Sequence, residues 1–248
     1  MAQQQRVAVV TGGSRGIGAA VARRLAAEGM ATVIIYQSNS ERAAAVVTGI
    51  VAAGGVAIAI PADVAQSLDM RRAVRDVVAR FGRIDVLVNC AGVLEMHTIN
   101  DLDATNIAEA FGVNFNGVVY AVQAALPHFP PEGGRIINFS SNLIYCPRIG
   151  TGLYAATKAA VSVLTNALAK ELGPKGITVN AVAPSLTRTD MTSGTPPARL
   201  EAVAAASPLG RIGEPDDMAD IVAFLASSQS RWITGRTLLA DGGLTDGL

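Results

Sequence analysis

The stretch Thr11-Gly12-Gly13-Ser14-Arg15-Gly16-Ile17-Gly18 stands between an apolar, β-branched run at Val7–Val10 and a helical pattern at Ile17–Glu28. Its glycines permit a tight turn and let the backbone come close to a pyrophosphate group, which then meets the positive end of the following helix. A glycine-rich turn alone indicates little, because glycines mark many turns. Placed between a strand and a helix, this one predicts a phosphate-binding turn in an α/β protein.

Outward from this turn, short strand-like runs alternate with longer helical stretches. Apolar residues of stretch 70–81 recur at helical spacing: Met70, Val74, Val77, Val78 and Phe81. Strands that are almost continuously apolar indicate a parallel sheet covered by helices on both faces. The pattern predicts one α/β domain over residues 1–248, with a doubly wound, Rossmann-type sheet of seven parallel strands. The predicted strands are Val7–Val10, Thr32–Tyr36, Val56–Ile60, Ile84–Asn89, Arg135–Ser140, Thr178–Ala183 and Thr237–Ala240.

The least regular region runs from Pro184 to Pro208 and is rich in Thr, Ser, Pro and Gly. An irregular insertion just past the carboxyl end of a strand lies where such sheets bind ligands. We therefore expect residues 184–208 to form a lid over the substrate site. A solvated surface loop is the alternative.

Composition excludes several classes of function. Half of the 248 residues are hydrophobic and only 16% are charged, against an average of about 25%, which excludes a disordered chain. Twenty basic residues balance twenty acidic ones and aromatic residues make up 4%, so neither nucleic acid nor anionic lipid is expected as a partner. The low charge leaves much apolar surface to cover, which predicts a homo-oligomer.

Metal binding and membrane insertion are also not expected. Two cysteines, Cys90 and Cys146, and two histidines offer neither a disulfide scaffold nor the spacing of a zinc site. The uncharged stretch 43–62 has the length of a membrane span, but glycines and Pro61 interrupt it. Residues 1–6 lack the apolar core of a signal peptide. We therefore expect a soluble protein of the cytoplasm.

The spacing Gly-x-x-x-Gly-x-Gly at positions 12–18 resembles that of the short-chain dehydrogenase/reductase family, and the resemblance extends along nearly the whole chain. Further landmarks similar to those of the family are Asp63-Val64, Asn89-Cys90-Ala91-Gly92, Asn114, Pro184-Ser185 with Thr189, and Asp241-Gly242-Gly243. Cys90, Ser185 and Thr187 depart from the residues usual in the family, which are Asn, Gly and Ile or Val. The resemblance implies a nicotinamide cofactor and an oxidoreductase that acts on carbonyl or alcohol groups. The residues predicted to contact the cofactor are Gly12, Ser14, Arg15, Gly16, Ile17, Gly18, Tyr36, Ser38, Asn39, Asp63, Val64, Asn89, Ala91, Gly92, Tyr154, Lys158, Pro184, Thr187 and Thr189.

Tyr154 and Lys158 are four residues apart, which places them on one face of a helix. A free tyrosine has a pKa of about 10, and we expect the ammonium of Lys158 to lower the pKa of Tyr154. Tyr154 then serves as the general acid in carbonyl reduction. Ser141 lies thirteen residues earlier, at the spacing that the resemblance implies, and is expected to hold the substrate oxygen; its neighbour Ser140 is the less favoured alternative. By resemblance, Lys158 also binds the nicotinamide ribose, and Asn114 secures a water that relays protons to it. The predicted catalytic residues are Asn114, Ser141, Tyr154 and Lys158.

Residues around the predicted Ser141 loop are candidates for the substrate pocket. Tyr145 follows Ser141 closely, and four other residues are expected to join it, although each is about as compatible with plain packing. The candidates are Leu143, Tyr145, Cys146, Leu153 and Met191.

The end of the second strand bears on cofactor choice. Enzymes selective for NAD commonly place an acidic residue there. This strand ends at Tyr36, and no acidic residue lies between Tyr36 and Glu41. Arg15 is expected to pair with the 2′-phosphate of NADP(H), with Ser38 and Asn39 as hydrogen-bond partners. NADP(H) is therefore the predicted cofactor and NAD(H) the alternative.

The favoured function is an NADP(H)-dependent ketoreductase acting on a small-molecule carbonyl or alcohol. Three alternatives stay open: a 3-oxoacyl-[acyl-carrier-protein] reductase, an NAD-dependent alcohol or polyol dehydrogenase, and a non-catalytic cofactor-binding regulator. Family resemblance and the apolar chain end, which includes Leu238, Leu239, Leu244 and Leu248, predict a homotetramer.

Overall fold

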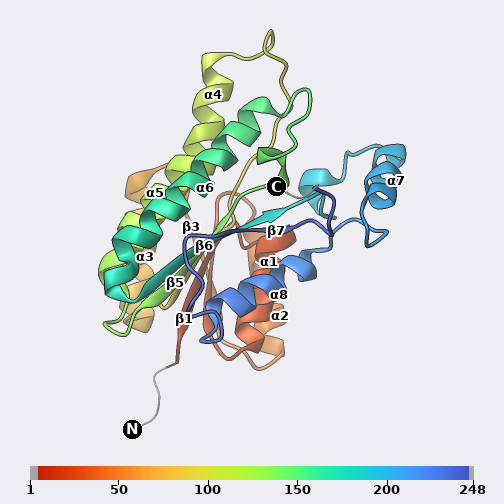
Figure 1. The fold of residues 1–248 in the computed structure, drawn as a ribbon. Helices are drawn as coiled ribbons and strands as arrows, with labels where there is room; N and C mark the ends of the chain where they lie inside the picture. The colour runs from red at the N-terminus through yellow and green to blue at the C-terminus, as the bar shows by residue number, and fades with distance from the viewer. Residues whose placement is uncertain (1–4, 246–248) are drawn as a thin grey trace.

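The computed structural model describes residues 5–245, so Leu248 and residues 1–4 lie outside the described part of the chain. Seven strands form one parallel sheet in the order β3-β2-β1-β4-β5-β6-β7 (Figure 1). Each predicted strand is present, with ends shifted by at most two residues. The strands are β1 (Val7–Thr11), β2 (Ala31–Tyr36), β3 (Ala57–Pro61), β4 (Val86–Asn89), β5 (Gly134–Phe139), β6 (Ile177–Pro184) and β7 (Thr237–Ala240).

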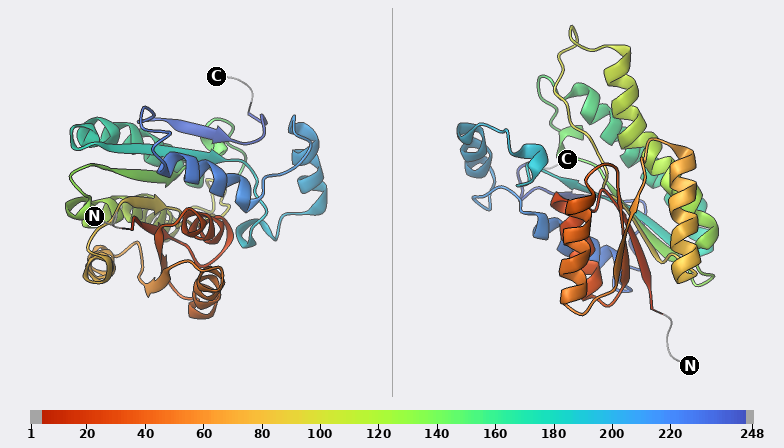
Figure 2. Two further views of the ribbon diagram at one scale, coloured as in Figure 1. Left: turned by 90° about the horizontal axis from the view of Figure 1, so that it is seen from below. Right: turned by 180° about the vertical axis from the view of Figure 1, so that it is seen from behind.

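Helices cover both faces of the sheet (Figure 2), as the apolar strands predict. Helices α3, α5 and α6 pack on one face, and α1, α2 and α8 pack on the other. The helices are α1 (Gly16–Ala27), α2 (Ser40–Ala52), α3 (Ser67–Phe81), α4 (Ala104–Phe111), α5 (Gly117–Ala125), α6 (Gly152–Leu172), α7 (Pro197–Ala206) and α8 (Pro215–Ala226). Short turns of helix are the π-helix η1 (Gly112–Asn116) and the 3₁₀ helices η2 (Leu126–His128), η3 (Asn142–Ile144), η4 (Gly173–Lys175) and η5 (Asp190–Thr192).

Helix α3 illustrates how the apolar spacing sets the packing. Met70, Val74 and Val77 are fully buried against the sheet, and each such side chain contributes about 1.5–3 kcal/mol by leaving water. The helix ends at Gly82, which has a φ of 80°, a left-handed conformation that glycine adopts without strain.

The order of the strands creates a crevice at their carboxyl ends. From β1 the chain builds β2 and β3 to one side, then returns to place β4 on the other side of β1. The helices after β1 and β4 therefore leave the sheet on opposite faces, and sheets of this type bind ligands at such a switch point. Ligand binding is thus expected at the ends of β1 and β4.

The expectation of an irregular segment over residues 184–208 is wrong in part. β6 extends to Pro184, and ten residues of the segment form helix α7. Prolines at 196 and 197 begin this helix, where a missing N–H costs nothing, and alanine, leucine and glutamate continue it. The Thr, Ser and Gly residues that suggested irregularity precede the helix, except Ser207, which follows it.

The described residues contain neither a membrane-spanning helix nor a cluster of metal-binding side chains. Within residues 5–245, no helix is long and apolar enough to cross a membrane. In the same part of the chain, no three side chains of His, Cys, Asp or Glu gather as metal ligands would.

Candidate active site

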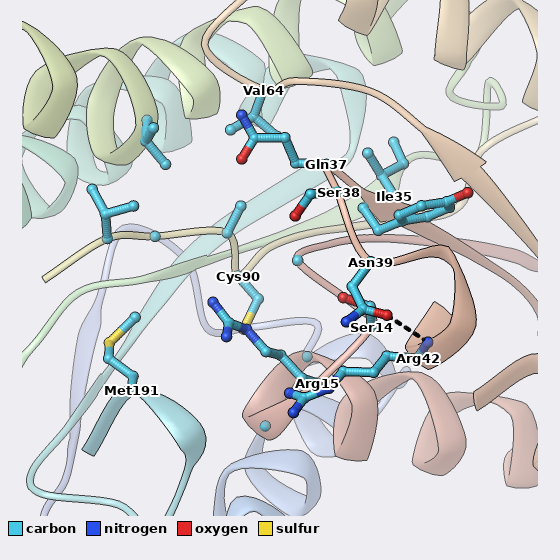
Figure 3. Close-up of a pocket in the computed structure, with 18 of the residues that line it drawn as sticks. Ser14, Arg15, Ile35, Gln37, Ser38, Asn39, Arg42, Val64, Cys90 and Met191 are labelled. Carbon is cyan, nitrogen blue, oxygen red and sulfur yellow. Dashed lines mark hydrogen bonds between the residues drawn. The ribbon is translucent and has the colours of Figure 1, made fainter. Parts of the chain in front are cut away.

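A groove with a volume of about 420 Å³ lies at the carboxyl ends of β1, β2 and β4 (Figure 3), within the range usual for ligand sites. Most of the residues predicted to contact the cofactor line it: Gly12, Ser14, Arg15, Gly16, Ile17, Gly18, Tyr36, Ser38, Asn39, Asp63, Val64, Ala91, Gly92 and Thr189. The predicted pocket residue Met191 lines it as well. Sequence reasoning missed eight further lining residues: Ile35, Gln37, Arg42, Ala62, Cys90, Val93, Val113 and Asp190.

The glycine turn is packed so closely that side chains have no room. A Cβ atom at Gly12 would lie 2.8 Å from the Cα of Ala91, and one at Gly18 would lie 2.3 Å from the carbonyl oxygen of Gly12. Gly12 and Gly16 also have positive φ values of 67° and 52°. The turn therefore presents bare backbone at the start of α1, and these residues fit the pyrophosphate of a dinucleotide.

Two arginines lie at one end of the groove, next to the end of β2 and the start of α2. Arg15 belongs to the glycine turn, and Arg42 lies in the first turn of α2 (Figure 3). The Oδ1 atom of Asn39 accepts a hydrogen bond of 2.9 Å from the backbone N–H of Arg42, and so caps α2 beside the groove. Asp190 also lines the groove here, and its carboxylate forms an ion pair with Arg42.

The predicted catalytic residues meet where β5 ends and α6 begins. Ser141 follows β5, and Tyr154 and Lys158 occupy the first two turns of α6. The Nζ atom of Lys158 lies 5.7 Å from the centre of the Tyr154 ring and donates a hydrogen bond of 3.0 Å to the carbonyl oxygen of Phe139. Lys158 is 4% exposed and Ser141 is 6% exposed, whereas Tyr154 is half-buried.

Asn114 closes the cluster from the π-helix η1, a distortion that is frequent at functional sites. Its Oδ1 accepts from the N–H of Val93 at 2.8 Å, and its Nδ2 donates to the carbonyl oxygen of Val93 and to Thr157. A Cβ at Gly92 would lie 3.2 Å from Asn114 Oδ1 and 3.5 Å from Lys158 Nζ. The two functional groups therefore converge on Gly92, at the edge of the groove.

The acid–base properties of this cluster correct one expectation. Burial raises the pKa of Tyr154 to about 12, and the hydrogen bond with Ser141 opposes the rise only in part. Burial also lowers the pKa of Lys158 to about 8. The predicted lowering of the Tyr154 pKa by Lys158 is wrong for the free protein: desolvation of the phenolate dominates and raises the pKa instead.

Several predicted site residues lie away from the groove lining. Asn89, Pro184, Thr187, Asn114, Ser141 and Lys158 are buried behind it. Of the predicted pocket residues, Leu143 is buried, Tyr145 is half-buried and Cys146 is exposed, and none of the three borders the groove. Leu153 and Tyr154 line a second, smaller hollow together with Val93, Glu95, His97, Asn106, Glu109 and Ala110.

Known proteins are similar to this chain over nearly its whole length. A family model described as Enoyl-(Acyl carrier protein) reductase matches residues 12–245. An oxidoreductase of Methylorubrum extorquens is 46% identical over 242 residues, which cover 96% of this chain and 97% of the relative. A 3-oxoacyl-[acyl-carrier-protein] reductase of Staphylococcus aureus is 40% identical, covering 96% and 97%. A short-chain dehydrogenase of Burkholderia cenocepacia, solved in complex with NADP, superposes with a TM-score of 0.92 at 45% identity, covering 98% of this chain and 99% of that one.

The chain belongs to the short-chain dehydrogenase/reductase family. It is accordingly an oxidoreductase that acts on carbonyl or alcohol groups with a nicotinamide cofactor. The glycine turn and the predicted Ser141, Tyr154 and Lys158 all lie at the carboxyl ends of the strands, where a doubly wound sheet positions a dinucleotide.

Proposed function

We propose that this family member is an NADP(H)-dependent reductase of small ketones and other free carbonyl compounds, with Ser141, Tyr154, Lys158 and Asn114 as its site residues. One observation carries the proposal: a half-buried tyrosine, hydrogen-bonded with Ser141, stands one helical turn from a buried lysine at the edge of the groove. Two arginines at the other end of that groove support the phosphorylated cofactor.

The raised pKa of Tyr154 suits a proton donor. With a pKa of about 12, the phenol keeps its proton at neutral pH and is available to the substrate oxygen. When bound, NADPH supplies the hydride for the carbonyl carbon. Ser141 holds the substrate oxygen next to the phenol, and the ammonium of Lys158 stabilises the phenolate that is left after proton transfer.

Lys158 is placed for this role by its backbone partner. The carbonyl of Phe139 holds its Nζ atom without neutralising its charge. Asn114 keeps the backbone of Val93 beside Gly92, so the wall facing the lysine stays fixed. We assign Asn114 a positioning role on this basis.

NADP(H) is favoured over NAD(H) by charge. Arg15 and Arg42 carry two guanidinium groups into the corner where β2 ends, and no acidic residue lies between Tyr36, the last residue of β2, and Glu41. Arginine pairs well with phosphate. The similar dehydrogenase of Burkholderia cenocepacia was solved with NADP, which supports the same choice here.

The hollow beside Tyr154 supports a free carbonyl substrate over a protein-bound one. Glu95 and Glu109 line it, and an acidic carrier protein is repelled by carboxylates near its docking point. The 3-oxoacyl-[acyl-carrier-protein] reductase alternative rests on relatives of that name.

Three further properties are part of the proposal. Residues 184–208 act as the lid, since Thr189 and Met191 line the groove while α7 projects away from the sheet (Figure 1). A homotetramer is supported by exposed apolar side chains such as Val163 on α6 and Trp232 near the chain end. Two free cysteines suit a reducing compartment such as the cytoplasm.

The test is NADPH and NADH oxidation with a panel of ketones, aldehydes, sugars and acetoacetyl thioesters. We expect turnover of free ketones with a preference for NADPH, and a fall in kcat of at least about 10²-fold in Tyr154→Phe. Tyr120→Phe, on α5, is the control and should leave kcat unchanged. Near-normal turnover in Tyr154→Phe would refute the assignment. Cofactor binding without turnover of any substrate would instead favour the non-catalytic regulator.

A further inference from the structure

Asp190 connects the segment 184–208 to the cofactor groove. It is the first residue of η5, its carboxylate pairs with Arg42, and its Oδ2 lies 4.0 Å from a guanidinium nitrogen of Arg15. The three side chains are about half exposed. A carboxylate is thus held by the two arginines assigned above to the cofactor phosphate, in a place that solvent and ligands reach.

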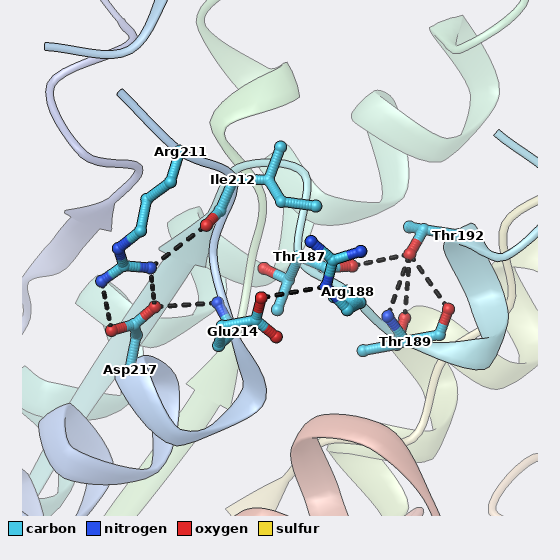
Figure 4. Close-up of polar contacts among 8 residues, drawn as sticks. All are labelled: Thr187, Arg188, Thr189, Thr192, Arg211, Ile212, Glu214 and Asp217. Atoms are coloured by element: carbon cyan, nitrogen blue, oxygen red, sulfur yellow. Dashed lines mark hydrogen bonds and ion pairs between the residues drawn. The ribbon is translucent and has the colours of Figure 1, made fainter. Parts of the chain in front are cut away.

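The same segment is anchored independently on its other side (Figure 4). Arg188 donates to Glu214 at 2.9 Å, and Thr192 donates to the carbonyl oxygen of Thr187 at 2.6 Å. The backbone of Thr187 forms a bridge with Gly213. These contacts fix η5 without Asp190, so the pair with Arg42 can open while the segment stays attached.

We propose that Asp190 is a specificity-determining residue for the cofactor: its carboxylate competes with the 2′-phosphate of NADP(H) for Arg15 and Arg42. The inference rests on the proposed use of NADP(H). Both anions seek the same guanidinium groups, and a single carboxylate carries less charge than a phosphate monoester. Phosphate binding therefore exchanges one anion for another and releases Asp190, whereas a cofactor without the phosphate leaves the Asp190–Arg42 pair in place.

The consequence is an affinity penalty that falls only on the phosphorylated cofactor. Exposed ion pairs of this kind are worth a factor of about two to five in an equilibrium constant. Removing the charge in Asp190→Asn should therefore tighten binding of a 2′-phosphorylated ligand by about two- to fivefold. Binding of the same ligand without that phosphate should stay unchanged.

The experiment measures binding of 2′,5′-ADP and of 5′-ADP by titration calorimetry, with no turnover involved. The variants are Asp190→Asn, Arg42→Ala and the two combined. The control is Glu201→Gln, which removes an exposed carboxylate from α7 in the same segment. Tighter 2′,5′-ADP binding in Asp190→Asn alone, lost when Arg42→Ala is added, supports the proposal, because a merely structural role would not depend on Arg42.

Other results overturn the proposal. Equal effects of Asp190→Asn on both ligands, or no effect on either, show that Asp190 does not compete with the phosphate. If the wild type binds 2′,5′-ADP no more tightly than 5′-ADP, the choice of NADP(H) itself fails, and the inference falls with it. The wild-type comparison therefore separates the two failures.

Discussion

We expect the buried Lys158 to lower the stability of the folded protein. Lys158 is 4% exposed, and burial lowers its pKa from 10.5 to about 8. At about 1.4 kcal/mol per pH unit, this difference lowers the free energy of unfolding by about 3 kcal/mol, which we call the penalty. The unfolded chain binds the proton more tightly than the folded protein, so the penalty is fully present below pH 8 and fades as pH rises towards 10.5.

We therefore expect Lys158→Met to abolish turnover and yet raise stability at pH 7. Loss of the hydrogen bond to Phe139 offsets part of the gain, by about 0.5–1.5 kcal/mol for a neutral donor. The part of that bond that depends on the proton is already contained in the pKa, so this offset is the same at every pH. The penalty falls to about 1 kcal/mol at pH 9.5. Between pH 7 and pH 9.5 the advantage of the variant should thus shrink by about 2 kcal/mol.

Thermal unfolding of the cofactor-free protein at the two pH values measures this change. For a domain of this size, about 2 kcal/mol corresponds to a shift of roughly 4–8 °C in the Tm difference between variant and wild type. Lys170→Met, at an exposed lysine of the same helix, is the control and should show a constant difference. A Lys158→Met difference that is the same at pH 7 and pH 9.5 would refute the argument from burial.

Three further outcomes are expected. Arg15→Ala should lower kcat/KM for NADPH about tenfold and leave kcat/KM for NADH nearly unchanged, while Tyr36→Asp should shift the cofactor preference towards NADH. Steady-state kinetics with both cofactors measures these changes. Equal losses of kcat/KM with NADPH and NADH in Arg15→Ala would count against Arg15 as a phosphate ligand. The rate of carbonyl reduction should fall above about pH 8, because Lys158 then loses its proton; a rate that stays level to pH 10 would contradict this. Asp85→Ala should lower the free energy of unfolding by about 2–4 kcal/mol, measured by denaturant titration, because it removes the buried carboxylate that accepts from the N–H of Val7 and from Arg83; an unchanged midpoint would contradict it.

The sheet could be predicted from sequence because its signal is local. β-branched runs such as Val7–Val10 are buried on both faces of a parallel sheet, so they are apolar without interruption. Composition over residues 184–208 does not indicate helix α7, because the prolines and threonines around the helix obscure the alanines within it. The residues of stretch 197–206 taken alone have high helix propensity, whereas the average composition of the longer segment 184–208 does not indicate a helix.

The electrostatics of the site could not be predicted in the same way. Asp190 and Arg42 are 148 positions apart, and no local pattern connects them. Arg42 leaves only an indirect signal: Asn39 is a good helix cap, so the third residue after it enters the first turn of a helix beside the groove. The pKa of Tyr154 depends on how deeply α6 buries the phenol, which the spacing of Tyr154 and Lys158 does not state.

The two ends of the sheet differ in how a buried charge is paired. At the amino ends of the strands, Asp85 accepts hydrogen bonds from Arg83 and from the backbone of Val7, so its charge is paired. At the carboxyl ends, the described residues place a backbone carbonyl against Lys158 and no carboxylate in a salt bridge with it. A carboxylate there would stabilise the fold but would cancel the field of the ammonium at Tyr154. Under the proposed mechanism, Lys158 therefore keeps its charge available for the phenolate, at the cost in stability that the Lys158→Met experiment measures.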